Sequence, residues 1–235
     1  MALVNEASEP YLSANRYAYY RARGKLRGDP VFTAILAQGW LSGSERILDL
    51  GCGEGLLAAW LLAARTRHAV RKEHSQSWPQ TWPAAPQPTS IRGIELNEHA
   101  VRRARNALGE QADFRVGDIT EAEFGLTDAI VILDVLHYID YRSQLRVLER
   151  AHASLAAGGV LLLRVSDAEA GIRFSIGKYL DQTLLLTRGH RSPRLYCRSV
   201  REWRHVLATG GFKTDFLPMS SGTPFANFML IARRA

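Results

Sequence analysis

The chain has 235 residues, of which 46% are hydrophobic and 23% are charged, as in an ordinary globular protein. Its two cysteines are too few for a disulfide framework, so we expect a reducing, cytoplasmic location. The start of the chain lacks a basic stretch followed by an apolar core, and the longest apolar run, 56–64, is too short to span a bilayer. We therefore expect neither a secretion signal nor membrane association.

The net charge of +7 raises the question of a nucleic-acid partner. The basic residues, however, are mostly arginines that are scattered over the expected helices and do not gather in one stripe. Charge alone therefore does not indicate nucleic-acid binding, and a solvated basic surface explains it equally well.

Residues 1–44 are expected to form helices that cap the rest of the chain. Residues 11–27 are aromatic and basic and predict a first helix, ended by Gly24 and Gly28, that either covers a binding cleft or packs on the core. Asp29-Pro30 is typical of an N-cap and first helical residue, so we expect a second helix from Pro30 to about Trp40.

The central motif is the segment 46–58. The apolar run 47–50 stops at Gly51, Gly53 and Gly55, and a second apolar run then begins at Leu56. This order predicts a buried strand, a tight turn and a buried helix. Glycine has no Cβ, so a ligand can approach this backbone closely, at the carboxyl edge where α/β sheets bind ligands.

The glycine spacing excludes two common nucleotide motifs. A dinucleotide fingerprint that starts at Gly51 would need glycine or alanine where the chain has Leu56. A phosphate-binding P-loop would need a Gly-Lys-Ser/Thr ending, which the segment lacks.

Residues 71–90 hold four prolines together with Trp78 and Trp82, and predict an irregular insertion. The preceding helix returns the chain to the amino ends of the strands. The insertion is therefore expected at the edge opposite the ligand, in a structural or partner-binding role.

Three further strands are expected to end in polar residues. Strand 91–96 carries Glu95 at its tip, where a carboxylate can accept two hydrogen bonds from a ribose diol; a surface acid that begins a helix is the alternative. Strand 112–116 leads into Gly117-Asp118, and the apolar strand 128–134 is expected to be buried on both faces. It runs into the cluster 134–140, which includes Asp134, His137 and Tyr138.

The chain then continues with an expected helix at 141–155 and a fifth strand at 158–165. Residues 166–198 leave the carboxyl end of this strand, with a helix expected at 172–187, and are a candidate lid. A helix at 199–208 and strands at 212–217 and 225–232 complete the chain. Without a linker or repeat, we expect one domain over 1–235.

Four features occur in order: Asp49-Leu-Gly-Cys-Gly-Glu-Gly55, Glu95, Gly117-Asp118-Ile119, and Asp134 with His137. Together they resemble the class I S-adenosylmethionine-dependent methyltransferases, and most closely the small-molecule branch that includes quinone-biosynthesis enzymes. The resemblance implies an α/β, Rossmann-like sheet of seven strands in the order 3-2-1-4-5-7-6, with strand 7 antiparallel and helices on both faces. It also implies S-adenosyl-L-methionine as methyl donor and S-adenosyl-L-homocysteine as product.

Carried over residue by residue, the resemblance implies that Asp118 accepts a hydrogen bond from the adenine amino group and that Ile119 packs on the ring. The full implied donor set is Asp49, Gly51, Cys52, Gly53, Gly55, Glu95, Leu96, Asp118, Ile119 and Asp134. No metal is expected.

His137 is the best-placed general base for a hydroxyl acceptor, although a packing role is equally open. The expected acceptor-side residues are His137, Tyr138, Arg173, Arg191, Arg194 and Tyr196. The lid is cationic, which suits an acidic aromatic or acyl small molecule, or else is only a solvated face. The segment after strand four lacks the Asn/Asp-Pro-Pro-Tyr/Phe motif, which favours a small acceptor. An RNA or protein methyltransferase, a nicotinamide oxidoreductase, a non-catalytic nucleoside-binding protein and a homodimer stay open.

Overall fold

The computed structural model describes residues 2–70, 78–169, 195–219 and 227–234. Within these residues the chain forms one seven-stranded sheet in the order β3-β2-β1-β4-β5-β7-β6, which confirms the expected topology. The strands are β1 Arg46–Leu50, β2 Ser90–Glu95, β3 Asp113–Val116, β4 Thr127–Leu133, β5 Leu155–Ser166, β6 Phe212–Pro218 and β7 Asn227–Arg234.

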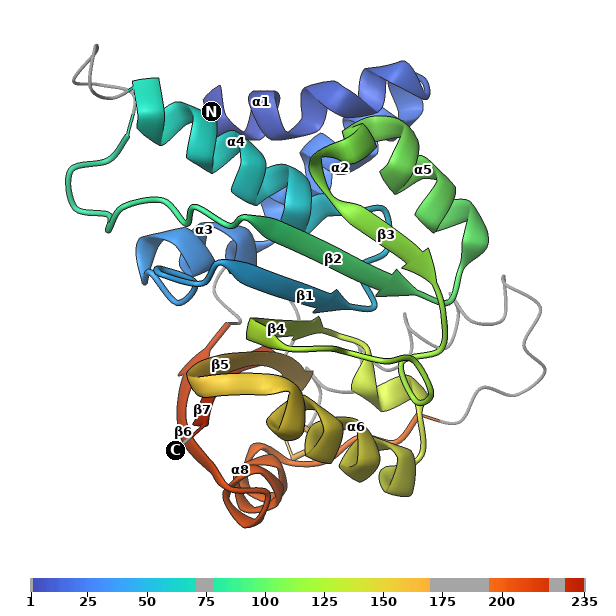
Figure 1. Cartoon of the computed structure of the whole chain (residues 1–235), viewed down its shortest axis with the longest axis vertical. Coiled ribbons are helices and arrows are strands. Elements are labelled where there is room, and N and C mark those ends of the chain that lie inside the picture. The colour runs from blue at the N-terminus through green and yellow to red at the C-terminus, as the bar shows by residue number, and fades with distance from the viewer. Residues whose placement is uncertain (1, 71–77, 170–194, 220–226, 235) are drawn as a thin grey trace.

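Strands β1 to β5 pair in parallel, whereas β7 runs antiparallel to both β5 and β6. The arrowheads of β1, β2 and β3 point the same way in Figure 1. The chain order reverses between β1 and β4, and the carboxyl edge at such a point is where open α/β sheets bind ligands.

Helices cover both faces of the sheet (Figure 1). One face carries α1 Ala2–Ser8, α2 Arg16–Gly28, α3 Pro30–Ala37, α4 Leu56–Val70 and α5 Glu98–Leu108; the other carries α6 Tyr141–Ser154 and α8 Val200–Thr209. The described part of the chain also holds the short 3-10 helices η1 Glu9–Ser13, η2 Gly109–Gln111 and η3 Leu136–Tyr138. No helix in these ranges is long and apolar enough to cross a membrane.

The alternation of strand side chains divides the interior into two cores. In β4, Ala129 and Val131 pack with α1 to α5, whereas Ile130 and Ile132 pack with α6 and α8. Strand β4 is thus buried on both faces, as its unbroken apolar sequence predicts.

The N-terminal segment differs from the prediction in three places. A helix α1 precedes the expected one. The helical structure is interrupted at residues 14–15, and α2 then begins with Asn15 as its N-cap, whose side chain accepts a hydrogen bond from the Ala18 N–H at 2.8 Å. The prediction that Gly24 ends the helix is wrong: α2 continues through it to Gly28, because Ala22 and Leu26 lie in the core on either side.

Other boundaries moved by a few residues. Helix α3 ends at Ala37, earlier than predicted, while Asp29 caps it by accepting a hydrogen bond from the Val31 N–H at 3.1 Å. Strand β5 begins at Leu155, before the Gly158-Gly159 pair, because Leu155 pairs with Thr127 ahead of a register shift. The helix predicted at 172–187 and the first residues of the strand predicted at 225–232 lie outside the described residues.

The described part of the Pro/Trp-rich insertion packs by its aromatic rings. Trp78 is buried, donates from Nε1 to the Pro83 carbonyl at 2.9 Å and meets Trp82 edge-on at 5.4 Å between ring centroids. The Thr89 N–H donates to the Glu45 carbonyl just before β1. These contacts lie toward the amino ends of the strands, away from the carboxyl edge.

Candidate functional site

The glycine turn after β1 uses a backbone conformation that favours glycine. Gly51, Gly53 and Gly55 have φ angles of 77°, 55° and 77°. The turn is tied to the neighbouring strand, because the N–H groups of Gly51 and Cys52 both donate to the Ile94 carbonyl, at 2.8 and 3.2 Å.

The three glycines face different surroundings. A Cβ at Gly51 would overlap the Val135 side chain, and a Cβ at Gly55 would lie 2.7 Å from the Phe114 ring. A Cβ at Gly53 would meet no atom within 4 Å. The middle glycine therefore borders open space, which leaves room for a ligand against its backbone.

Glu95 connects the tip of β2 to this turn. Its Oε2 accepts a hydrogen bond from the Gly53 N–H at 3.0 Å, and its Oε1 accepts one from the Asn97 N–H at 2.9 Å. The next side chain, Leu96, is 70% exposed. A carboxylate and an apolar side chain thus stand together at the open side of the turn.

Asp49 and Cys52 lie buried beneath the same turn. Burial, together with the negative charge of Glu95, raises the pKa of the Asp49 carboxyl to about 7. Burial and the nearby Asp49 also raise the pKa of the Cys52 thiol. Cys52 is therefore a protonated packing residue and not a nucleophile.

The outer side of the turn is supported by residues that the sequence analysis did not identify. The Tyr11 hydroxyl donates to the Glu54 carbonyl at 2.7 Å, and burial raises the pKa of Tyr11, so the phenol stays a donor. The buried Glu54 carboxylate pairs with Arg21 of α2 at 3.1 Å and with Arg103 of α5. The available signal was an acid inside a glycine turn next to an apolar helix.

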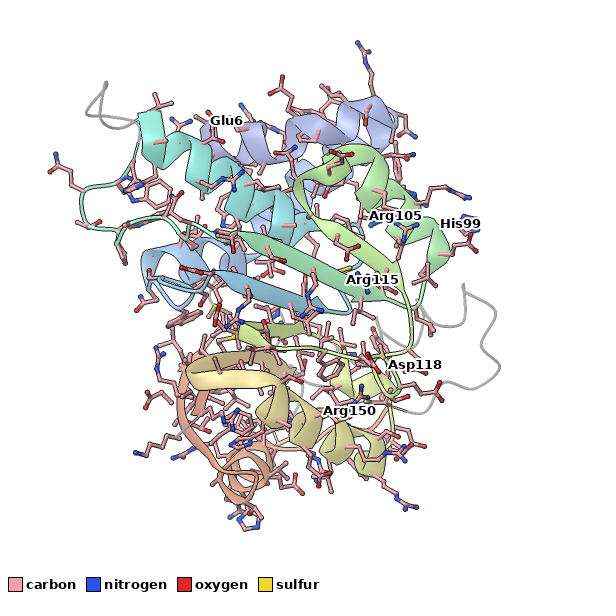
Figure 2. All side chains as sticks on the ribbon, viewed as in Figure 1. Glu6, His99, Arg105, Arg115, Asp118 and Arg150 are labelled. Atoms are coloured by element: carbon pink, nitrogen blue, oxygen red, sulfur yellow. The ribbon has the colours of Figure 1, made fainter. Side chains whose placement is uncertain are left out.

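The loop after β3 carries Asp118 and Ile119. Asp118 is exposed and its Oδ1 accepts a hydrogen bond from the Thr120 N–H at 2.8 Å, whereas Ile119 is buried. Arg150 of α6 holds this loop by donating to the Thr120 carbonyl at 2.8 Å, and its guanidinium stacks on Phe124. Figure 2 labels Asp118 on this loop and Arg150 on α6.

Asp134 follows β4 in a left-handed conformation, with a φ of 58°. Among the described residues other than glycine, no other has a positive φ. Arg164 of β5 donates to it from Nε at 3.0 Å and also pairs with Asp29 at the start of α3. Neither Arg164 nor Asp29 was predicted as a site residue, although Arg164 is a lone charge in an apolar strand.

The 3-10 helix η3 holds His137 and Tyr138, with ring centroids 4.1 Å apart. The buried Gln144 of α6 fixes this region: its Nε2 donates to the carbonyls of Leu136 at 3.0 Å, Ile139 at 3.2 Å and Tyr196 at 2.8 Å. The Tyr196 N–H in turn donates to the His137 carbonyl at 2.9 Å.

The predicted site residues therefore fall into three groups. The first group is in direct contact: the glycine turn is hydrogen-bonded to Glu95 of β2 and packs against Val135, which follows Asp134. In the same group, the Tyr196 N–H is hydrogen-bonded to the His137 carbonyl. Asp118 and Ile119 lie on the next loop along the same edge, which is joined to β2 by the hydrogen bond from the Gly117 N–H to the Glu95 carbonyl at 3.0 Å. Arg173, Arg191 and Arg194 lie outside the described residues.

Among the described residues, no group of three His, Cys, Asp or Glu side chains is arranged to hold a metal ion. What the edge offers is hydrogen-bond acceptors at the tips of β2 and β3, open backbone at Gly53 and an imidazole after β4. This set suits a neutral diol and an amino-bearing ring more than a phosphate.

Comparison with known proteins places this site in context. The model of a family described as "Methyltransferase domain" matches residues 17–215. A curated relative, the carboxy-S-adenosyl-L-methionine synthase of Chromohalobacter salexigens, is 28% identical over 134 residues, which make up 55% of this chain and 43% of the relative. The chain thus matches less than half the length of that protein.

Solved structures share the fold. An O-methyltransferase family protein from Burkholderia thailandensis superposes with a TM-score of 0.64 at 19% identity, covering 94% of this chain and 60% of that one. The magnesium protoporphyrin IX methyltransferase of Synechocystis PCC 6803, solved with S-adenosylhomocysteine, gives 0.60 at 18% identity, covering 94% and 88%. At such identities the likeness establishes the fold alone.

Proposed function

The chain belongs to the methyltransferase-domain family, and from this premise we propose that it is an S-adenosylmethionine-dependent methyltransferase acting on a small molecule. The observation that carries the proposal is the open backbone at Gly53, held by Glu95 at the carboxyl edge between β1 and β2. A nucleoside seated there needs a close backbone approach and an acid for its ribose, and the turn offers both.

Each donor-side residue then has a distinct task. Glu95 accepts hydrogen bonds from the ribose hydroxyls, and Leu96 and Ile119 enclose the adenine ring, whose amino group donates to Asp118. Asp49 and Cys52 support the turn from below, because both are buried. Gly51 and Gly55 keep the backbone in shape, and Asp134 lies toward the methionine half of the donor.

When bound, the donor supplies a methyl group on a sulfonium, which is already an activated electrophile. The protein therefore has to align the acceptor with that methyl group and exclude water. The new bond joins the methyl carbon to the acceptor atom, the carbon–sulfur bond breaks, and the acceptor's proton leaves to a base or to solvent.

We assign the base to His137, which η3 holds at the carboxyl end of β4. Replacing His137 by Asn is expected to lower kcat for a hydroxyl acceptor by about 10²–10⁴-fold, the usual contribution of general-base catalysis, with donor affinity unchanged. If kcat holds in this variant, His137 only packs, together with Tyr138, against the acceptor.

For the acceptor we propose a small acidic aromatic or acyl molecule. The basic residues Arg173, Arg191 and Arg194 of the expected lid suit a carboxylate, and Tyr196, which is tied to His137, suits a flat ring. The proposed place of action is the cytoplasm, and light scattering would decide whether the enzyme is a homodimer.

Calorimetric titration tests the donor assignment directly. The full chain is titrated with S-adenosylhomocysteine, with NAD and short RNA as controls. Saturable binding of S-adenosylhomocysteine alone is the expected result. Binding of NAD or RNA in its place would support an oxidoreductase or an RNA-modifying enzyme, and binding of none would remove the proposal.

The curated relative favours a second candidate, an enzyme that makes carboxy-S-adenosyl-L-methionine. The two candidates differ in the fate of the donor, which mass spectrometry detects. A methyltransferase converts it to S-adenosylhomocysteine. The second enzyme would need a carboxyl-donating co-substrate and would return a donor in which a carboxylate replaces one methyl hydrogen, heavier by the mass of CO2.

A further inference from the structure

A buried ion cluster connects three separate segments at the carboxyl edge of the sheet. Its centre is Arg164 of β5, whose side chain is 4% exposed. From Nε and Nη2 the guanidinium donates to both oxygens of Asp134, and from Nη1 and Nη2 it donates to both oxygens of Asp29. The junction of α2 and α3 is thereby fixed to the residue that follows β4.

The cluster holds two carboxylates for a single guanidinium. Burial opposes the charge on Asp29, but the hydrogen bond and charge of Arg164 prevail and hold the pKa of Asp29 below its usual value. The exposed Lys25 adds a weaker attraction. Arg164 stays protonated because Asp134 and Asp29 raise its pKa against the effect of burial. The cluster therefore has surplus negative charge.

Asp134 is the member of the cluster that solvent reaches most, with 32% of its side chain exposed against 16% for Asp29. Its neighbour Val135 packs against Gly51 of the glycine turn. Its left-handed φ of 58° is a strained conformation for a residue with a side chain. The two hydrogen bonds that Arg164 donates to the Asp134 carboxylate offset this strain.

We propose that Asp29 and Arg164 are positioning residues that hold Asp134 as a counter-charge for the cationic half of the donor. Arg164 sets the direction of the Asp134 carboxylate, and Asp29 draws part of the guanidinium's positive charge away from it. The inference rests on the proposed function, because it assumes that S-adenosylmethionine binds at this edge.

The Asp29→Asn variant isolates this role from folding. Asparagine caps helices as well as aspartate, so α3 keeps its cap to Val31 while the charge beside Arg164 is lost. Arg164 and Asp134 would then form a neutral pair. Asp128→Asn is the matched control: it removes a carboxylate that is paired with Arg46 at the amino end of the same strand, β4.

Calorimetry would compare three ligands that share the adenosine moiety. S-adenosylmethionine has a sulfonium and an ammonium, S-adenosylhomocysteine has only the ammonium, and methylthioadenosine has neither. In Asp29→Asn we expect affinity for S-adenosylmethionine to fall roughly three- to tenfold, as for losing one nearby charge near a protein surface. The loss should be smaller for S-adenosylhomocysteine and absent for methylthioadenosine.

An equal loss for all three ligands would show that Asp29 only supports the fold, and an unchanged affinity for S-adenosylmethionine would show that its charge is not felt at the site. Either result, or the same pattern in Asp128→Asn, overturns the inference while leaving the proposed function intact. A wild-type protein that binds none of the three removes the proposed function first.

Discussion

The glycines of the turn after β1 serve two different purposes at the residue scale. Gly51 and Gly55 make room for Val135 and Phe114, so they are needed for packing. A Cβ at Gly53 would meet no atom within 4 Å, so this glycine is needed for its positive φ and its open side. The sequence does not distinguish the three glycines, because it does not show whether a side chain or open space lies next to each one.

This difference predicts opposite outcomes for two matched variants. Gly51→Ala should lower the free energy of unfolding by about 2–5 kcal/mol, because a left-handed alanine is strained and its Cβ overlaps Val135. Gly53→Ala should lose only about 1–2 kcal/mol, the backbone strain, yet bind S-adenosylhomocysteine poorly. Urea unfolding and calorimetry measure the two effects, and equal stability losses would contradict this division.

Asp49 predicts a pH dependence of stability. Its pKa rises from 3.8 to about 7 on folding, because the carboxyl is buried near Glu95. The folded state thus binds more protons than the unfolded state between these values, so this group lowers stability as pH rises from about 4 to 7.

The Asp49→Asn variant cannot titrate and should lack this contribution. Relative to wild type, it should gain stability between pH 5 and pH 8 by an amount on the order of a few kcal/mol. Parallel urea unfolding curves of the ligand-free proteins would show it. A constant difference across this pH range would mean that Asp49 is already ionised in the folded protein.

At the scale of elements, Gln144 is the link between α6, η3 and the segment that ends the expected lid. It donates to carbonyls at 136, 139 and 196, and its Oε1 accepts a hydrogen bond from Arg198 Nε at 2.9 Å. The loop bearing His137 therefore depends on one amide that is fully buried.

Gln144→Met should keep the volume and lose these bonds. We expect a loss of roughly 2–4 kcal/mol in stability, since buried carbonyls would be left without a donor. Donor affinity should be spared, because the hydrogen bonds of Gln144 go to residues 136, 139, 196 and 198 and not to Glu95 or Gly53. Arg198→Met, which removes a single bond of the same set, should cost less. A Gln144→Met protein as stable as wild type would show that water replaces the amide.

The elements themselves were largely predictable. Apolar runs and glycine turns located every strand of the sheet to within a few residues, and the family resemblance predicted their order, which is confirmed. The resemblance to methyltransferases is likewise confirmed by the family match over 17–215. The roles assigned to individual donor and acceptor residues stay predictions.

Long-range side-chain pairs were beyond the sequence. Arg164 and Asp29 are 135 positions apart, and Tyr11 and Glu54 are 43 apart. The local periodicity of the sequence does not indicate which distant polar residues will form a hydrogen bond or ion pair in the folded protein. The sequence showed only that Arg164 interrupts an apolar strand and that Glu54 lies within a glycine turn.

On the scale of the whole molecule, the N-terminal helices are part of the main body of the fold. Ala18, Ala22 and Leu26 of α2 are buried in the same core as Trp60 of α4, and Tyr11 reaches the glycine turn. The sequence left open whether this segment packs or covers a cleft. The structure shows that it packs, and through Tyr11 and Arg21 it also supports the proposed donor site.

The two cores also have different optical probes. Four of the five tryptophans, Trp40, Trp60, Trp78 and Trp82, pack in the core of α1 to α5, whereas Trp203 alone reports the opposite face. A Trp203→Phe protein would therefore show by fluorescence the unfolding of one face, and a protein that retains only Trp203 would show the other. The guanidinium of Arg198 lies 5.6 Å from the Trp203 ring, so emission from this indole would also register any displacement of the 195–198 segment.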